Sequence, residues 1–150
     1  MMKGKKEKAG FTIIELMVVV AAAAMILSFV TFLFVDSKKR SRDSRRERDM
    51  KELQNALNLY AGSNQLFPVC GRIVIDGSAD CLSSVLISGE FVVHMSADPL
   101  DKGEGSCGVS DDHVYCYTSE DGFGYILEYN LETDSILGKS AGWQTIVVRH

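Results

Sequence analysis

Cysteines are the residues whose type and spacing say most about chemistry in this 150-residue chain. All four lie in the C-terminal part, at Cys70, Cys81, Cys107 and Cys116. An even number of cysteines in a small soluble region is typical of disulfides and of an oxidising compartment. Sequence alone leaves the connectivity open. We favour the local pairs, Cys70 with Cys81 and Cys107 with Cys116, because each closes a short loop that would staple a small domain.

The histidines give little support for catalysis. His94, His113 and His150 have no nucleophile at motif spacing, and the sequence has neither a phosphate-binding glycine loop nor a zinc-peptidase helix. His113 lies between two cysteines, but this spacing matches no common zinc-finger pattern, and disulfides explain the cysteines better. We therefore expect no enzymatic activity.

A loop rich in carboxylates is the candidate for binding a metal ion. Its acidic residues are Asp98, Asp101, Glu104, Asp111 and Asp112. Oxygen-rich loops can bind calcium, but this spacing is not that of an EF-hand. Acidic side chains are also mostly solvated in proteins. We expect no cofactor, with calcium at this loop as the weaker alternative.

An apolar segment near the N-terminus is the first element that must position these groups. From Phe11 to Val35 the only charged residue is Glu15. Helices rise about 1.5 Å per residue, so these 25 residues are long enough to cross a hydrocarbon core of about 30 Å. Residues 11–35 are therefore predicted to form a transmembrane helix.

A charged segment continues this helix. Residues 36–60 contain neither Gly nor Pro, and the helix is predicted to end near Gly62. One apolar stripe on it is suited to packing on a folded domain, namely Met50, Leu53, Leu57 and Tyr60.

Seven basic residues between Lys38 and Arg48 raise the alternative of nucleic-acid or anionic-lipid binding. Acidic residues four positions away allow ion pairs along the helix instead, at Lys39–Asp43, Arg45–Asp49, Glu47–Lys51 and Arg48–Glu52. Because these acids weaken the net positive field, we favour a solvated helix face and expect no nucleic-acid partner.

The C-terminal part shows shorter signals. The "RIVI" at 72–75 is a short strand or a loop, residues 81–91 are a short helix ending at Gly89, and residues 96–112 are a loop. These lengths suit one small domain rather than several.

Three strands are predicted in the last third of the chain. Two of them lie in residues 113–132, joined by the Asp121-Gly122 turn, and the third begins at Trp143. They would form an antiparallel sheet with one face free to receive the helix. The predicted fold class is α+β, with a long N-terminal helix, half membrane-spanning and half amphipathic, packed on a small C-terminal antiparallel β-sheet.

Three interpretations compete for the N-terminal segment, and Glu15 separates them. A secretory signal would be cut after the alanines at 21–24, but Glu15 interrupts its apolar region and the apolar run continues beyond them. A plain membrane anchor leaves Glu15 unexplained, at a cost of about 2.5–3.5 kcal/mol near a helix centre. A cut between Gly10 and Phe11 would instead create an amine one helical turn from Glu15. That amine can pair with Glu15 of a neighbouring copy, which makes the carboxylate an assembly device.

The stretch "KAGFTIIELMVVV", residues 8–20, resembles the type IV pilin-like family. Precursors of that family carry a short basic leader ending in Gly, then Phe-Thr, two hydrophobic residues, Glu and a long apolar helix. The resemblance implies that a prepilin peptidase cleaves between Gly10 and Phe11 and methylates the amine of Phe11. It also implies that Glu15 directs subunit addition, and that the fold is a lollipop with the apolar half of the helix in a filament core.

Two further stretches are similar to the major pseudopilins within this family. Residues 50–70 resemble their helix end and Pro-terminated loop, and "DPLDKGEG" at 98–105 resembles their Asp-Pro loop. Such proteins use calcium in this part of the fold, which the resemblance extends to the acidic loop. Phe32 stands where many relatives have a helix-kinking proline, and the four cysteines are unlike the usual major pseudopilin.

The resemblance implies a structural subunit of a type IV pilus-like filament or a secretion pseudopilus. Its expected partners are other copies, related pilin subunits, prepilin peptidase and an inner-membrane assembly platform, with nucleic acid only for a DNA-uptake pilus. The expected division is a cleaved leader at 1–10, an assembly helix at 11–35, its amphipathic continuation at 36–62 and a disulfide-containing α+β head at 63–150. The alternative is a membrane-anchored extracytoplasmic binding module that does not polymerise.

The expected location is the inner membrane, with a single span and an exported head, followed by a periplasmic or extracellular filament. Four basic residues precede the apolar segment and seven follow it, which by itself favours the opposite orientation. The cysteines favour export of the C-terminal part.

Overall fold

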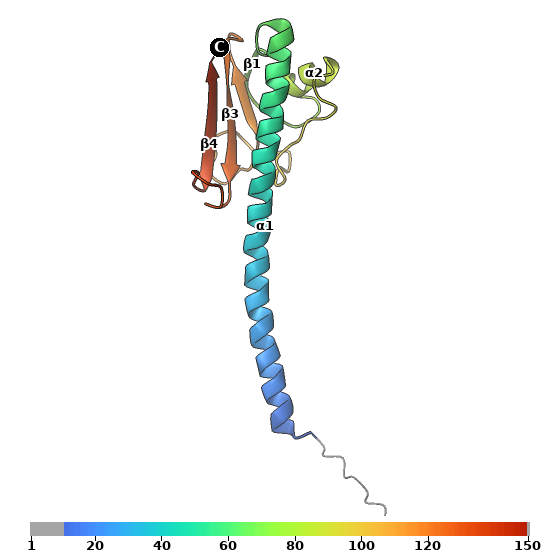
Figure 1. The fold of residues 1–150 in the computed structure, drawn as a ribbon, viewed down its shortest axis with the longest axis vertical. Coiled ribbons are helices and arrows are strands. Elements are labelled where there is room, and N and C mark those ends of the chain that lie inside the picture. Colours follow the sequence, from blue (N-terminus) through green and yellow to red (C-terminus); the bar gives the residue numbers. More distant parts are fainter. Residues whose placement is uncertain (1–10, 150) are drawn as a thin grey trace, which may run out of the picture. The chain divides into compact units, whose positions relative to one another are not determined.

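The computed structural model describes residues 11–149, except for the side chains of residues 31–33. Its elements in chain order are α1 (Ile13–Asn64), β1 (Cys70–Val74), α2 (Cys81–Ser88), β2 (Cys116–Ser119), β3 (Gly124–Leu131) and β4 (Gly142–Arg149) (Figure 1). The chain divides into two compact units, one ending at Lys38 and one beginning at Lys39. One long helix and one antiparallel sheet confirm the predicted α+β class.

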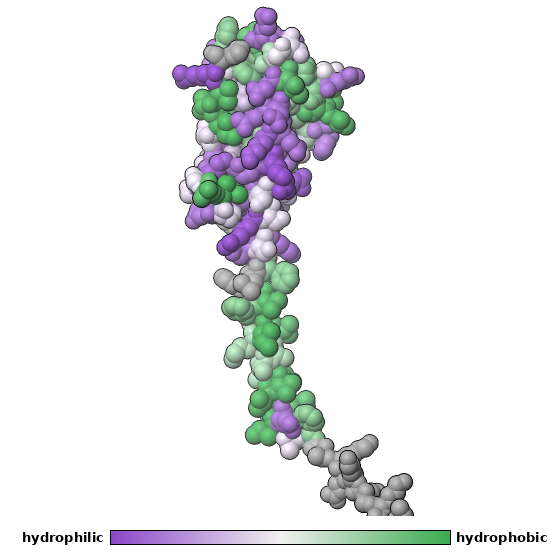
Figure 2. Space-filling view, viewed as in Figure 1, coloured by the Kyte–Doolittle hydropathy of each residue, from purple (hydrophilic) through white to green (hydrophobic). Residues whose placement is uncertain are grey.

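The N-terminal unit exposes apolar side chains. Every residue from Phe11 to Val30 is exposed, and α1 is apolar and long enough to cross a membrane by length and composition. Figure 2 shows this unit as hydrophobic along most of its described length. An uninterrupted exposed apolar surface of this size is typical of a segment that meets lipid or other protein.

The C-terminal unit contains a sheet with the strand order β1-β2-β3-β4, in which all neighbours are antiparallel. The predicted hairpin is confirmed, since β2 and β3 flank the Asp121-Gly122 turn and Gly122 has a φ of +77°. The prediction of three strands was incomplete, because β1 adds a fourth. An irregularity in its register between Cys70 and Ile73 breaks the alternation that identifies a strand in sequence.

One face of α1 and one face of the sheet form the hydrophobic core. Figure 1 shows the sheet beside the C-terminal half of α1. The predicted stripe is confirmed: Met50, Leu53 and Leu57 are buried, and Tyr60 packs edge to face on Phe91 with ring centroids 5.2 Å apart. The sheet contributes alternate residues, chiefly Tyr117, Tyr125, Leu127 and Tyr129.

The two helices end differently. The prediction that α2 ends at Gly89 is confirmed, and α2 begins with Asp80, whose carboxylate accepts a hydrogen bond from the Ser83 amide at 2.8 Å. The prediction that α1 ends near Gly62 is confirmed to within two residues, since the helix runs to Asn64. Gln65 stops it by adopting a left-handed φ of 65°, with its amide still bonded to the Ala61 carbonyl at 2.7 Å.

Candidate assembly site and the ion pairs that support it

Thr12 starts helix α1. Its hydroxyl oxygen accepts a hydrogen bond from the Glu15 amide at 3.3 Å, and its carbonyl accepts one from the Leu16 amide at 3.2 Å. Thr followed three residues later by Glu is the spacing of a capping box, and a carboxylate in the first turn suits the helix dipole. Thr12 and Glu15 therefore give α1 a defined N-terminus immediately after Phe11. Gly10 and the rest of residues 1–10 lie outside the described residues.

Glu15 is a single carboxylate on an apolar surface. Its neighbours are largely exposed, at 76% for Phe11, 72% for Ile14 and 59% for Leu16. Within the described part of the chain, no cation forms an ion pair with Glu15, because the ion pairs there all involve residues beyond Val35. Glu15 is therefore a carboxylate that no cation of the described residues neutralises, and it is available to other molecules.

Farther along α1, the opposite arrangement occurs around Arg46. The Arg46 side chain is fully buried and donates to Asp98 at 2.6 and 2.9 Å, to Asp43 at 2.7 Å and to Glu132 at 2.8 Å. Burial lowers the pKa of Arg46, but its bonds to Asp98 and Glu132 outweigh this and raise it, so the guanidinium stays charged. Arg46 therefore joins α1 both to the loop before β2 and to the end of β3.

Glu132 binds a second arginine. Arg42 donates to its two carboxylate oxygens at 2.7 and 2.5 Å in a bidentate pair. Burial alone would raise the pKa of Glu132, but the hydrogen bonds from Arg42 and Arg46 lower it to about 2. The buried Asp43 in turn accepts hydrogen bonds from the Glu132 and Thr133 amides. We call Arg42, Asp43, Arg46, Asp98 and Glu132 the buried ion cluster.

The prediction of a solvated helix face is confirmed for the exposed Arg45, Arg48 and Lys51, but the prediction of local ion pairs was wrong for Asp43 and Glu47. Asp43 is buried and pairs with Arg46 rather than Lys39. Glu47 pairs with Lys139 of the β3–β4 loop at 2.5 Å and also accepts a hydrogen bond from the Tyr129 hydroxyl. The predicted pair of Arg45 with Asp49 is present at 3.6 Å. The physical reason is that partners distant in sequence bind these side chains in place of the local partners. The same contacts cover the side chains and exclude water from them.

A sequence signal for the buried ion cluster existed. The apolar stripe of Met50, Leu53 and Leu57, continued toward the N-terminus at the same spacing of three and four, reaches Arg46 and then Asp43. Charged residues on the buried stripe of a helix need partners from the surface it packs on. The distant partners themselves, Asp98 and Glu132, carry no such signal.

The disulfides join Cys70 to Cys81 and Cys107 to Cys116, the two short-range pairs that loop length favours. The first ties β1 to the start of α2, and the second ties the loop before β2 to β2 itself. His113 therefore has no free thiol beside it among the described residues, which leaves the zinc alternative without its sulfur ligands.

Four of the five calcium candidates line one cavity of about 400 Å³, together with His113. They are Asp101, Glu104, Asp111 and Asp112. Asp98 is separate, because both of its carboxylate oxygens bind Arg46. Among residues 11–149, no group of three or more acidic, histidine or cysteine side chains is arranged to hold a metal ion.

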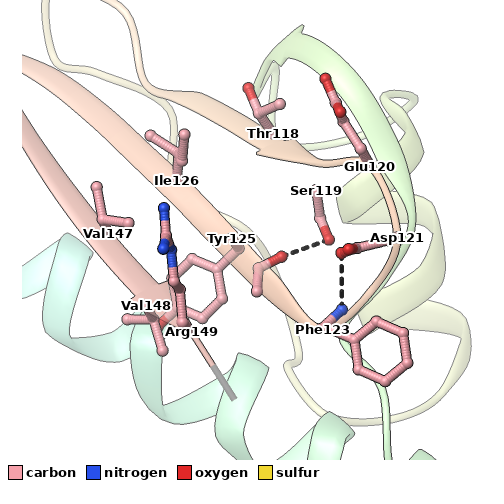
Figure 3. A pocket seen from close by; sticks show the side chains of 11 residues that line it. Thr118, Ser119, Glu120, Asp121, Phe123, Tyr125, Ile126, Val147, Val148 and Arg149 are labelled. Atoms are coloured by element: carbon pink, nitrogen blue, oxygen red, sulfur yellow. Dashed lines mark hydrogen bonds between the residues drawn. The ribbon is translucent and has the colours of Figure 1, made fainter.

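A second cavity, of about 510 Å³, lies at the β2–β3 turn (Figure 3). Its polar side chains serve the turn: the Ser119 hydroxyl donates to the Gly124 carbonyl at 2.6 Å, and Asp121 accepts from the Phe123 amide at 3.0 Å. Its lining contains neither His nor Cys. These contacts explain its polar groups as structural ones.

The model of the prokaryotic N-terminal methylation motif matches residues 5–31, which include Phe11 and Glu15. The type II secretion system core protein G of Vibrio cholerae serotype O1 is 33% identical over 67 residues, covering 45% of this chain and 46% of that protein. The core protein G of Aeromonas hydrophila is 30% identical over 64 residues, covering 43% and 45%. The motif and these similarities support a type IV pilin-like family. The chain spans about half the length of the relatives it matches. No solved structure matches it.

The matched motif includes the described start of α1. It contains the Thr12 cap and the Glu15 carboxylate, which has no ion-pair partner among the described residues. The buried ion cluster lies wholly beyond residue 31 and so outside the motif. Helix α1 thus has an N-terminal part within the matched motif and a C-terminal part that makes contacts with the rest of the C-terminal unit.

Proposed function

We propose that this protein is a structural subunit of a type IV pilus-like filament, and more specifically of a secretion pseudopilus. The observation that carries the proposal is the N-terminal methylation motif at residues 5–31. It contains the start of a helix that Thr12 caps and whose apolar side chains are exposed. The similarity to two type II secretion core proteins favours the pseudopilus within this class. On this proposal residues 1–10 are a leader, 11–35 the assembly helix, 36–62 its continuation and 63–150 the head.

Processing would take place between Gly10 and Phe11, by a prepilin peptidase that then methylates the new amine of Phe11. The new N-terminus would stand one residue before the Thr12 cap, at the positive end of the helix dipole. Repulsion between the amine and the dipole would make a carboxylate partner valuable. Glu15 of a neighbouring subunit supplies that partner in an environment where neither charge has another.

The exposed apolar surface of α1 would have two successive partners, lipid before assembly and other subunits in the filament. Before assembly, lipid of the inner membrane covers it, with the head on the exported side, where disulfides persist. In the filament, the same helices of other subunits cover it. Partners would therefore include other copies, related pilin subunits and an inner-membrane assembly platform.

The first test is the intact mass of the membrane-extracted protein after co-expression with a prepilin peptidase. We expect loss of residues 1–10 and one added methyl group. The matched control is Gly10→Val, which we expect to stay uncut, because a branched side chain replaces glycine at the bond to be cleaved. An uncut wild-type chain, or one cut after the alanines at 21–24, would overturn the proposal in favour of an anchored or secreted binding module.

A further inference from the structure

The outward face of α1 in the C-terminal unit is basic. Arg45, Arg48 and Lys51 are exposed at a spacing of three residues, on the side of the helix away from the buried Arg46 and Met50. Between residues 39 and 59, Glu52 is the only fully exposed acidic residue. Neither Arg48 nor Lys51 forms an ion pair with any residue that the structure describes. We call Arg45, Arg48 and Lys51 the basic face.

A surface of the opposite charge lies on the same unit. The cavity lined by Asp101, Glu104, Asp111 and Asp112 contains four carboxylates and one lysine, Lys102. Two of these carboxylates already serve the loop, because Asp101 accepts a hydrogen bond from the Gly103 amide and Asp112 one from the Ser106 amide. Glu104 and Asp111 are exposed and make no ion pair within the described residues.

Within one chain these two surfaces form no ion pair with each other. We propose that the acidic loop of one copy docks on the basic face of α1 in a neighbouring copy. This inference rests on the proposed function. Two different, complementary patches on one chain make a head-to-tail contact, which propagates into an open filament when the rotation does not close a ring.

The position of the basic face supports this partner. It lies on the same helix, α1, whose N-terminal part is the proposed assembly segment. Subunits that pack through that segment bring their heads close together, so a weak contact between heads acts at high effective concentration. Each exposed ion pair contributes roughly a twofold to fivefold factor, and the contact repeats at every subunit. High salt should weaken it, since exposed charges are screened over about 8 Å at physiological ionic strength.

Charge reversal followed by charge exchange tests the contact in the full chain, in cells that carry the peptidase and the assembly machinery. The helix variant is Arg48→Glu with Lys51→Glu, the loop variant is Glu104→Lys with Asp111→Lys, and the exchange variant combines all four. The measured quantity is the amount of filament sedimented from the cells relative to total subunit. The matched control is Glu120→Lys with Arg149→Glu, two exposed residues that line the other cavity.

We expect the helix variant and the loop variant each to lose filament by roughly fourfold or more, since two exposed pairs are reversed in each. The exchange variant should regain wild-type filament to within about twofold, and the control should resemble wild type. Normal filament in both one-sided variants would overturn the inference and leave the proposed function standing. A helix-variant loss that the exchange variant fails to restore would also overturn it, and would assign the basic face to anionic lipid or another partner. Absence of filament in wild type would overturn the proposed function as well.

Discussion

Two regions of helix α1 place a carboxylate in opposite environments. Glu15 lies on an exposed apolar surface and has no ion-pair partner among the described residues, whereas Asp43 is fully buried and bound to Arg46 at 2.7 Å. The difference indicates that a charged side chain paired within the chain stabilises the fold, whereas one without such a partner is available to bind other molecules. The buried carboxylates of the unit that begins at Lys39 have their partners within that unit, whereas Glu15 has none among the described residues.

The comparison also explains why one helix can serve two purposes. The C-terminal half of α1 is fixed by the apolar stripe and by the buried ion cluster, so its face toward the sheet is fully used. In the N-terminal unit, every residue from Phe11 to Val30 is exposed, so its apolar surface is available to lipid or to other proteins. A substitution in the N-terminal half should therefore affect assembly without affecting the fold, whereas one on the buried face of the C-terminal half should destabilise the fold.

The largest expected effect is on assembly, from Glu15→Val. We expect this change to abolish sedimentable filament while the protein remains inserted in the membrane and its head melts at the wild-type temperature. The reason is that the substitution removes the only charge on the assembly segment and touches no residue of the core. Glu120→Val, an exposed acidic residue of the head, is the matched control and should assemble normally. Normal filament with Glu15→Val would show that the open carboxylate has no role in assembly.

The next effect is on stability, from Arg46→Met. This substitution keeps the length of the side chain but leaves Asp43, Asp98 and Glu132 buried without their shared cation. Breaking a buried ion pair on one side costs about 3–5 kcal/mol of unfolding free energy. Chemical unfolding of the full chain in detergent, followed by circular dichroism, measures it.

The control for Arg46→Met is Arg45→Met, one residue earlier. Arg45 is half-exposed and has a looser pair with Asp49 at 3.6 Å, so its loss should cost about 0.2–1 kcal/mol. Equal effects of the two substitutions would mean that the buried ion cluster contributes no more than a surface pair.

Elements with a regular local pattern could be predicted from the sequence. The stripe of Met50, Leu53 and Leu57, the Asp121-Gly122 hairpin and the end of α2 at Gly89 all repeat a pattern that spans only a few residues. The N-terminal motif is equally local, because Thr12, Glu15 and the bond at which we propose cleavage lie within one helical turn or next to it. The division into domains, the role of Glu15 and calcium binding stay predictions.

The buried ion cluster could not be predicted as a whole, because its members meet only in the fold. Arg46 lies 52 residues from Asp98 and 86 residues from Glu132. Sequence reasoning gave Arg46 no partner and placed Asp98 in a calcium loop, since local spacing was the only guide to neighbours. Non-local pairing also produced the fourth strand, β1, which lies beside β2 although more than 40 residues separate them.

The smallest expected effect is on the pH dependence of stability, and it tests the contrast between the paired carboxylates of the buried ion cluster and Glu15. The pKa of Glu132 is about 2 in the folded protein, against an ordinary value of 4.5, because Arg42 and Arg46 hold its carboxylate charged. Between these values the unfolded chain binds a proton that the folded chain does not, so stability falls as the pH drops from about 4.5 toward 2. The loss attributable to Glu132 should be about 2 kcal/mol, after allowance for its residual exposure to solvent.

Glu132→Gln isolates that contribution, measured as the unfolding free energy of the full chain between pH 6 and pH 2.5. The variant should be less stable than wild type at pH 6 and should lose less on acidification, so that the two curves converge. Asp76 titrates in the same window, because backbone amides of Ser78 and Ala79 lower its pKa to about 2, and it remains in both proteins as an internal reference. Curves that stay parallel would place the acid sensitivity outside the buried ion cluster. Convergence would show that Arg42 and Arg46 of α1 keep the Glu132 carboxylate charged for folding, in contrast to Glu15, which has no ion-pair partner among the described residues.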